Sequence, residues 1–86
     1  MPELSRFLGI VIAMYYRDHA PPHFHAEYGN DEILVEIGNL NVLAGTLPRR
    51  AAGLVLDWAA MHLPELQNAW DQARNMEPLD AIDPLP

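Results

Sequence analysis

With 86 residues, half of them hydrophobic, the chain has material for one hydrophobic core and too little for two independent domains, and so small a core favours a homo-oligomer or an obligate partner. The absence of cysteine excludes disulfides and thiolate metal sites, so a zinc ion would need histidine and carboxylate ligands. Twelve acidic residues against five arginines give a formal charge of −7, which opposes unaided binding to nucleic acid and favours a basic protein partner.

The chain begins with a short lead over residues 1–5, and the β-branched residues that follow predict a strand over residues 7–16. The apolar part of this run, Leu8 to Tyr16, covers nine residues, whereas a helix needs roughly 20 to span a bilayer. No signal-peptide pattern accompanies the run. We therefore expect a cytoplasmic protein without a membrane segment.

The next segments predict a loop and a β-hairpin. Residues 17–22 form the loop, because two successive prolines remove backbone donors and disfavour helical geometry. Alternation over residues 23–28 and 32–37, with turn residues between them, predicts the hairpin, and residues 40–44 predict a further short strand. In the first hairpin strand one face carries His23, His25 and Glu27, and the face expected to meet the core carries Phe24, Ala26 and Tyr28.

A helical pattern follows the predicted sheet. Thr46 is placed to cap a helix, and Pro48 is tolerated in its first turn. Apolar side chains then keep one helical phase from residue 51 to residue 73, with His62 in the same stripe. An interior proline costs about 3 kcal/mol, so Pro64 predicts a kink or a break.

These elements predict an α+β fold, because a sheet with one apolar face and a helix with one apolar stripe bury each other. We expect a small antiparallel sheet of about four strands, packed on a C-terminal helix that is kinked or broken near Pro64. Trp58 and Trp70 would lie in the contact between the two layers. Residues 1–76 form the single domain, and residues 77–86 form a proline-rich acidic tail that is extended or loosely ordered.

Three of the four histidines, His19, His23 and His25, lie within seven residues, and Glu27 continues the alternation. Imidazole exchanges protons near neutral pH, so these four residues are candidate catalytic acids and bases. His23 and His25 could instead bind one metal ion, zinc for example, with His19 as a third ligand and an open position for water. The structural alternative is that the histidines hydrogen-bond the double-proline loop against the sheet.

Arg49 and Arg50 form a candidate anion site. They lie in the predicted first helical turn, where the macrodipole already presents positive charge. We therefore expect a bound anion or nearby acidic side chains to neutralise them. A phosphate bound there with histidines alongside would suit cleavage of a phosphodiester. The alternative is ion pairing with Asp18, Glu32 or Glu36.

Four strings resemble the small bacterial domain of unknown function numbered 4160: Ser-Arg-Phe-Leu-Gly-Ile from Ser5, Met-Tyr-Tyr from Met14, Asp-His-Ala-Pro-Pro-His-Phe-His-Ala-Glu-Tyr-Gly from Asp18, and Gly-Thr-Leu-Pro-Arg-Arg from Gly45. The resemblance covers nearly the whole chain, although Pro64 departs from the usual uninterrupted helix. Genes of this kind resemble halves of two-gene modules, and some are labelled toxin or antitoxin components. The resemblance therefore implies a small partner protein encoded by an adjacent gene, and it supplies no catalytic residues.

The sequence is compatible with three functions. The leading hypothesis is a component of a toxin–antitoxin type module that binds an anion or RNA phosphate through a surface shared by the histidines and Arg49 and Arg50. The second is a non-catalytic protein–protein interaction module that uses an exposed sheet edge. The third is a metal-dependent hydrolase with His19, His23 and His25 as ligands. The first hypothesis requires the histidines and arginines to lie together.

Overall fold

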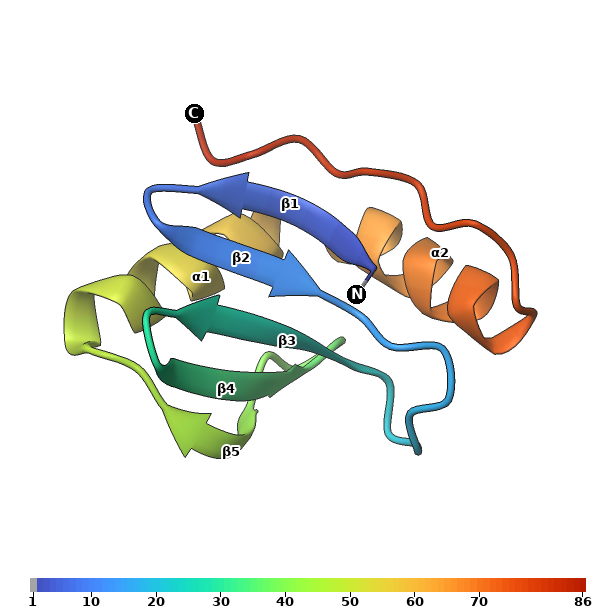
Figure 1. Ribbon diagram of the computed structural model, residues 1–86, viewed down its shortest axis with the longest axis horizontal. Helices are drawn as coiled ribbons and strands as arrows, with labels where there is room; N and C mark the ends of the chain where they lie inside the picture. The colour runs from blue at the N-terminus through green and yellow to red at the C-terminus, as the bar shows by residue number, and fades with distance from the viewer. Residues whose placement is uncertain (1) are drawn as a thin grey trace.

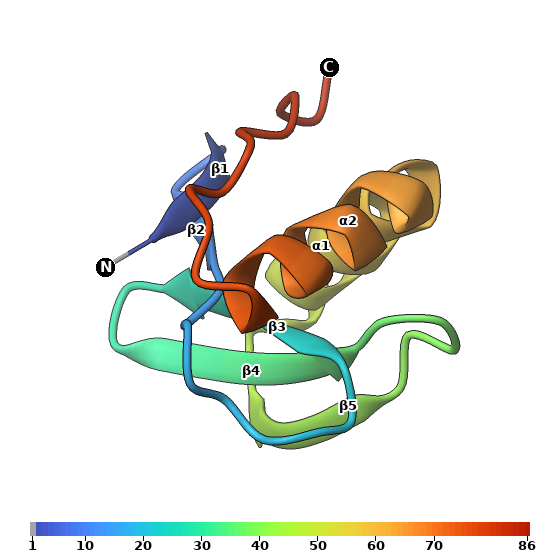
Figure 2. The same ribbon diagram turned by 90° about the vertical axis from the view of Figure 1, so that its right-hand side faces the viewer.

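The computed structural model describes residues 2–86, in which all strands precede the helices (Figure 1). The strands are β1 (Glu3–Phe7), β2 (Ile10–Ala13), β3 (His23–Tyr28), β4 (Asp31–Glu36) and β5 (Val42–Thr46), and the helices are α1 (Arg49–Met61) and α2 (Leu63–Arg74). The strands form one antiparallel sheet in chain order. Figure 2 shows the sheet bending around the helices, so the predicted α+β class is confirmed.

The sheet has five strands because a tight turn divides the first apolar run. Leu8 and Gly9 both take left-handed backbone angles, with φ of 50° and 81°, and β1 and β2 form a hairpin in which Phe7 pairs with Ile10. The prediction of a lead over residues 1–5 and one strand over residues 7–16 was therefore wrong. β1 already begins at Glu3, β2 ends at Ala13, and Met1 lies outside the described residues.

The hairpin of β3 and β4 confirms the predicted alternation for most of its length. Phe24 and Ala26 are fully buried. Tyr28, which was expected to face the core, is 38% exposed because it is the last residue of the strand and pairs with exposed Asp31 at the turn.

β5 is the outer strand of the sheet beside β4, and all five of its residues are exposed. It begins at Val42 instead of residue 40, because Leu40 belongs to a turn in which its N–H donates to the Glu36 carbonyl oxygen. Gly45 has a φ of 81° and lies so close to β4 that a Cβ atom there would collide with the carbonyl oxygen of Glu32. Only glycine fits this position.

The helical region is broken near Pro64, as predicted. His62 has a φ of −130°, ends α1 and precedes α2, and Pro64 lies in the first turn of α2, where its missing donor is no loss. Thr46 does not cap α1, because it is part of β5 and Pro48 occupies the N-cap position. Within residues 2–86, neither helix has the length and apolar character needed to cross a membrane.

The hydrophobic core fills the space between the bent sheet and the helices. Trp58 of α1 is fully buried at its centre, with its ring 5.6 Å from that of Phe7 and 6.0 Å from that of Phe24, measured between centroids. Trp70 of α2 is 3% exposed. Both tryptophans are therefore core residues, as predicted.

Residues 77–86 are extended and packed against the domain. Ile82 is buried, and its N–H donates to the carbonyl oxygen of Leu4. The indole Nε1 of Trp58 donates to the carbonyl oxygen of Asp83. Figure 1 shows this tail running beside β1. Of the two predicted states, extended or loosely ordered, the structure has the first.

Candidate functional site

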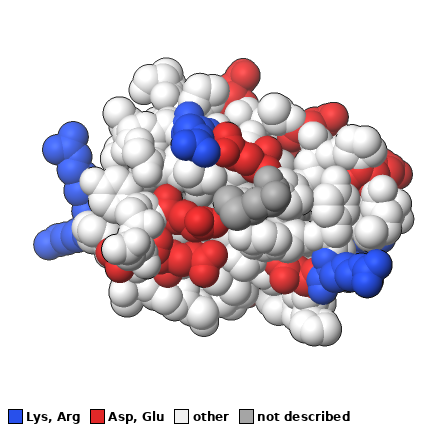
Figure 3. Space-filling model, in the orientation of Figure 1, with Lys and Arg blue, Asp and Glu red and all other residues white. Residues whose placement is uncertain are grey.

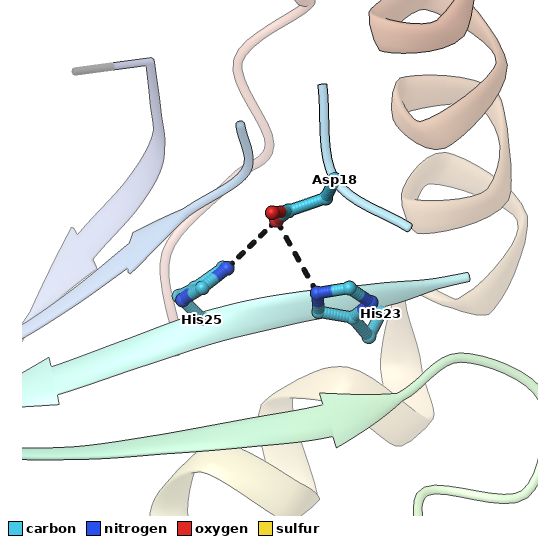
Figure 4. Close-up of side chains that lie close together, drawn as sticks. All are labelled: Asp18, His23 and His25. Atoms are coloured by element: carbon cyan, nitrogen blue, oxygen red, sulfur yellow. Dashed lines mark hydrogen bonds and ion pairs between the residues drawn. The ribbon is translucent and has the colours of Figure 1, made fainter. Parts of the chain in front are cut away.

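Three side chains that can bind a metal ion converge where the loop between β2 and β3 folds back over β3. Asp18 lies in the loop, and His23 and His25 are the first and third residues of β3 (Figure 4). Asp18 Oδ2 lies 3.2 Å from His23 Nε2 and 2.8 Å from His25 Nε2. The three candidate ligand atoms all lie within 4.8 Å of one another.

This cluster is largely removed from solvent. The exposed fractions of the side chains are 28% for Asp18, 8% for His23 and 12% for His25. Trp70 of α2 packs on His23, with ring centroids 5.4 Å apart, and Tyr15 meets His25 edge-on at 4.5 Å. Partial burial lowers the local dielectric and strengthens the interaction of the carboxylate with any cation placed beside it.

Hydrogen bonds hold both imidazole rings from behind. His23 Nδ1 lies 2.8 Å from the carbonyl oxygen of Pro21, and His25 Nδ1 lies 3.0 Å from Glu32 Oε2. Both oxygens belong to groups that only accept, so each Nδ1 carries a proton and donates it. In the neutral ring, Nε2 then has an unshared electron pair, and both such pairs point at the Asp18 carboxylate.

Electron pairs that face a carboxylate repel it unless positive charge lies between them. One solution is a proton on Nε2 that is donated to Asp18, whose Oδ2 lies within hydrogen-bond distance of His25 Nε2. The other solution is one cation shared by the three ligand atoms. Histidines that bind metals typically donate their other N–H to a carboxylate or carbonyl, as His23 and His25 do.

The sheet and the double-proline loop position these groups. The Ile37 N–H donates to the Pro22 carbonyl oxygen at 2.9 Å, which fastens the loop to the end of β4. His25 pairs with Leu34, so Glu32, two residues before Leu34 in β4, lies diagonally opposite on the same face and reaches His25 Nδ1. Burial, followed by the nearby carboxylates, raises the pKa of Tyr15.

The structure brings His23 and His25 together as their spacing predicted, and it adds Asp18. Within residues 2–86 the converging group contains neither His19 nor Glu27. His19 is exposed beside Asp18, and Glu27 lies two residues beyond His25 on β3.

Arg49 and Arg50 lie away from the histidines. Arg50 lines a groove with Tyr28, the last residue of β3, whereas His23 is its first residue. Five steps along a strand span about 16 Å. Figure 1 shows α1 beginning at the left, on the side where β3 ends, whereas β3 begins further to the right, so the two groups do not form one surface.

The ion pairs considered for Arg49 and Arg50 are also absent from the described part of the chain. There, Arg6 is the one arginine that pairs with a carboxylate, that of Glu3. Asp18 and Glu32 contact the histidines instead. The first-turn arginines are exposed to solvent.

An open polar pocket that shares Asp18 with the cluster could not be predicted from the sequence. Its volume is about 430 Å³, and its lining residues are Tyr16, Arg17, Asp18, His19, Ala20 and Arg74. Arg17 and Asp18 come from the loop, and Arg74 comes from the last turn of α2. No local pattern signals this contact, because it depends on how α2 packs against the sheet.

His62, the fourth histidine, has a structural position. Its ring packs on Trp58 with centroids 5.3 Å apart, and it hydrogen-bonds to Glu65, which lowers the pKa of that carboxyl group. It lies at the break between α1 and α2.

The fold and the site define a small α+β domain with a partly buried Asp-His-His cluster. The chain belongs to the family described as Domain of unknown function (DUF4160), whose sequence pattern matches residues 9–71. This range includes the cluster and ends before Arg74 and the tail. Searches of curated proteins and of solved structures found no similar protein.

Proposed function

We propose that the protein is a hydrolase that uses one divalent transition-metal ion, bound by Asp18, His23 and His25. The observation that carries this proposal is the convergence of three ligand atoms while both Nδ1 atoms donate to acceptors behind the rings. Two imidazoles and one carboxylate suit zinc, iron or manganese and leave coordination positions for water and substrate. The sequence suggested a metal-dependent hydrolase with His19, His23 and His25 as ligands. The present proposal keeps His23 and His25 and replaces His19 by Asp18.

The reaction would be the hydrolysis of an ester. A metal ion held by Asp18, His23 and His25 would lower the pKa of coordinated water and polarise the ester. The water oxygen forms a bond to the electrophilic carbon or phosphorus, the bond to the leaving oxygen breaks, and that oxygen takes up the proton that the water releases. Hydrogen bonds from His23 to Pro21 and from His25 to Glu32 would keep both rings oriented throughout.

Zinc titration of protein purified without a histidine tag tests the proposal. We expect one zinc ion per chain. Asp18→Asn should weaken zinc binding by roughly 100-fold or more, because removing a direct metal ligand costs more affinity than removing a residue that only hydrogen-bonds to a ligand. Asp57→Asn is the matched control, since Asp57 is an exposed carboxylate on α1 and the charge change is the same. Equal zinc binding by the two variants, or no zinc binding by the unmodified protein, would rule out the metal site.

Glu32→Gln tests the role of the group behind His25. Its carboxylate accepts from His25 Nδ1, and loss of its charge makes the imidazole a poorer ligand. We expect zinc affinity to fall about tenfold. Glu36→Gln on the same strand is the control, because Glu36 bonds to Asn39 instead of the cluster. A Glu32 variant with unchanged affinity would remove this residue from the site.

A protein–protein interaction module remains the second candidate, because every residue of β5 is exposed at the open side of the sheet. Such an edge can pair with a strand of another chain. This candidate requires partner binding that survives Asp18→Asn. The partner encoded by an adjacent gene, the homo-oligomer, the toxin–antitoxin role and the cytoplasmic location stay predictions.

A further inference from the structure

We infer that the substrate is a small phosphate ester whose phosphate group binds in the pocket between Arg17 and Arg74. This inference rests on the proposed hydrolase function, because the pocket gains its role from the cluster beside it. Arg17 and Arg74, which line one pocket with Asp18 and His19, take the place that the sequence analysis gave to Arg49 and Arg50.

The pocket and the cluster share one residue, Asp18. Asp18 lines the pocket and also directs Oδ2 at both histidines. A group held in the pocket would therefore contact the residue whose carboxylate faces His23 and His25. The pocket volume of about 430 Å³ lies within the usual range for small-molecule sites.

The charge at this pocket favours an anion. Both arginines are exposed, and within residues 2–86 neither forms an ion pair, although the chain has twelve acidic residues. The one carboxylate in the lining, that of Asp18, is engaged by His23 and His25. Two guanidinium groups from separate elements therefore share an opening with no carboxylate paired to either.

Phosphate matches this arrangement better than a carboxylate does. A guanidinium group donates two parallel hydrogen bonds to phosphate, and a phosphate monoester has three terminal oxygens to share between two arginines. A carboxylate has two oxygens and one charge. Exposed His19 lines the same pocket and adds a further donor for the third oxygen.

The overall charge argues against a nucleic acid as the substrate. Binding to a polyanion needs an extended basic surface, and this chain has a net charge of −7. Figure 3 shows its positive charge in small areas separated by acidic and neutral surface. The lower right area lies where Figure 1 shows the loop before β3 meeting the end of α2. A pocket with two arginines suits one phosphate group on a small molecule.

The experiment is a titration of the full chain with inorganic phosphate, with and without zinc, followed by phosphorus NMR. We expect Arg17→Gln and Arg74→Gln each to weaken phosphate binding about tenfold, because each removes a charge-assisted pair of hydrogen bonds. Arg49→Gln is the matched control, with the same charge change at the far end of the molecule. The arginine variants should bind zinc as the unmodified protein does. With zinc bound, hydrolysis of 4-nitrophenyl phosphate should fall in the two pocket variants and not in the control.

The outcomes separate the two proposals. Arginine-dependent phosphate binding without zinc binding would keep the phosphate site and remove the hydrolase. Zinc binding with phosphate affinity that is absent, or reduced equally by Arg49→Gln, would overturn the phosphate inference alone. A ten-nucleotide RNA that binds through Arg17 and Arg74 far more tightly than phosphate would also overturn it, in favour of a nucleic acid substrate. Circular dichroism spectra would establish that each variant is folded.

Discussion

Replacing Trp58 by alanine is expected to lower the free energy of unfolding by about 3–5 kcal/mol. The side chain is fully buried against Phe7, Phe24 and His62, and its Nε1 donates to the carbonyl oxygen of Asp83. Removing a buried tryptophan typically costs about 3–5 kcal/mol. A domain of this size has a total stability of roughly 4–13 kcal/mol, so the loss would consume much or all of it.

Chemical denaturation followed by tryptophan fluorescence would measure this effect, because Trp70 remains in every variant. Trp58→Phe is the control, because it retains an aromatic ring and loses the donor to the tail, and we expect it to cost less than the alanine variant. An alanine variant with a denaturation midpoint close to that of the unmodified protein would contradict the assignment of Trp58 as the centre of the core.

The second large effect is expected at Gly45, where alanine should destabilise the fold by about 2–4 kcal/mol. A φ of 81° strains any side chain, and the added Cβ would collide with the Glu32 carbonyl oxygen, a backbone atom that cannot rotate away. β5 would have to separate from β4. Because Glu32 also bonds to His25, we expect zinc affinity to fall together with stability.

Gly53→Ala is the matched control for Gly45→Ala. Gly53 lies in α1, is exposed, and an added Cβ would meet no atom within 4 Å. Alanine is a better helix former by about 1 kcal/mol, so this variant should be more stable than the unmodified protein. Thermal unfolding should give a lower melting temperature for Gly45→Ala and a higher one for Gly53→Ala than for the unmodified protein. A change in the same direction for both variants would refute the steric explanation.

The parts of the fold that follow local rules could be predicted from the sequence. Alternation over β3 and β4 and the proline in the helical pattern gave the hairpin and the helix break. The turn at Leu8 and Gly9 could not be predicted, because leucine rarely takes a left-handed angle and both residues stood inside an apolar run. The packing of the tail was missed because Ile82 contacts β1 only through tertiary structure.

The candidate site was predictable only where its residues share a strand. His23 and His25 lie on one face because strand side chains alternate. Asp18 reaches them through a loop, whose path follows from long-range contacts such as that of Ile37 with Pro22. The position of Arg74 depends on the packing of α2. The chemistry of Arg49 and Arg50 was argued from the helix terminus alone, which does not reveal how far that terminus lies from the histidines.

The backbone hydrogen bond from the Ile82 N–H to the Leu4 carbonyl oxygen has a consequence for self-association. It places the tail along the outer side of β1, so β5 is the side on which another chain could extend the sheet. Copies that joined through β5 would stop at two, whereas a sheet open on both sides can grow into a fibre. The packing of residues 77–86 beside β1 would therefore limit association through the sheet edges to a pair of chains.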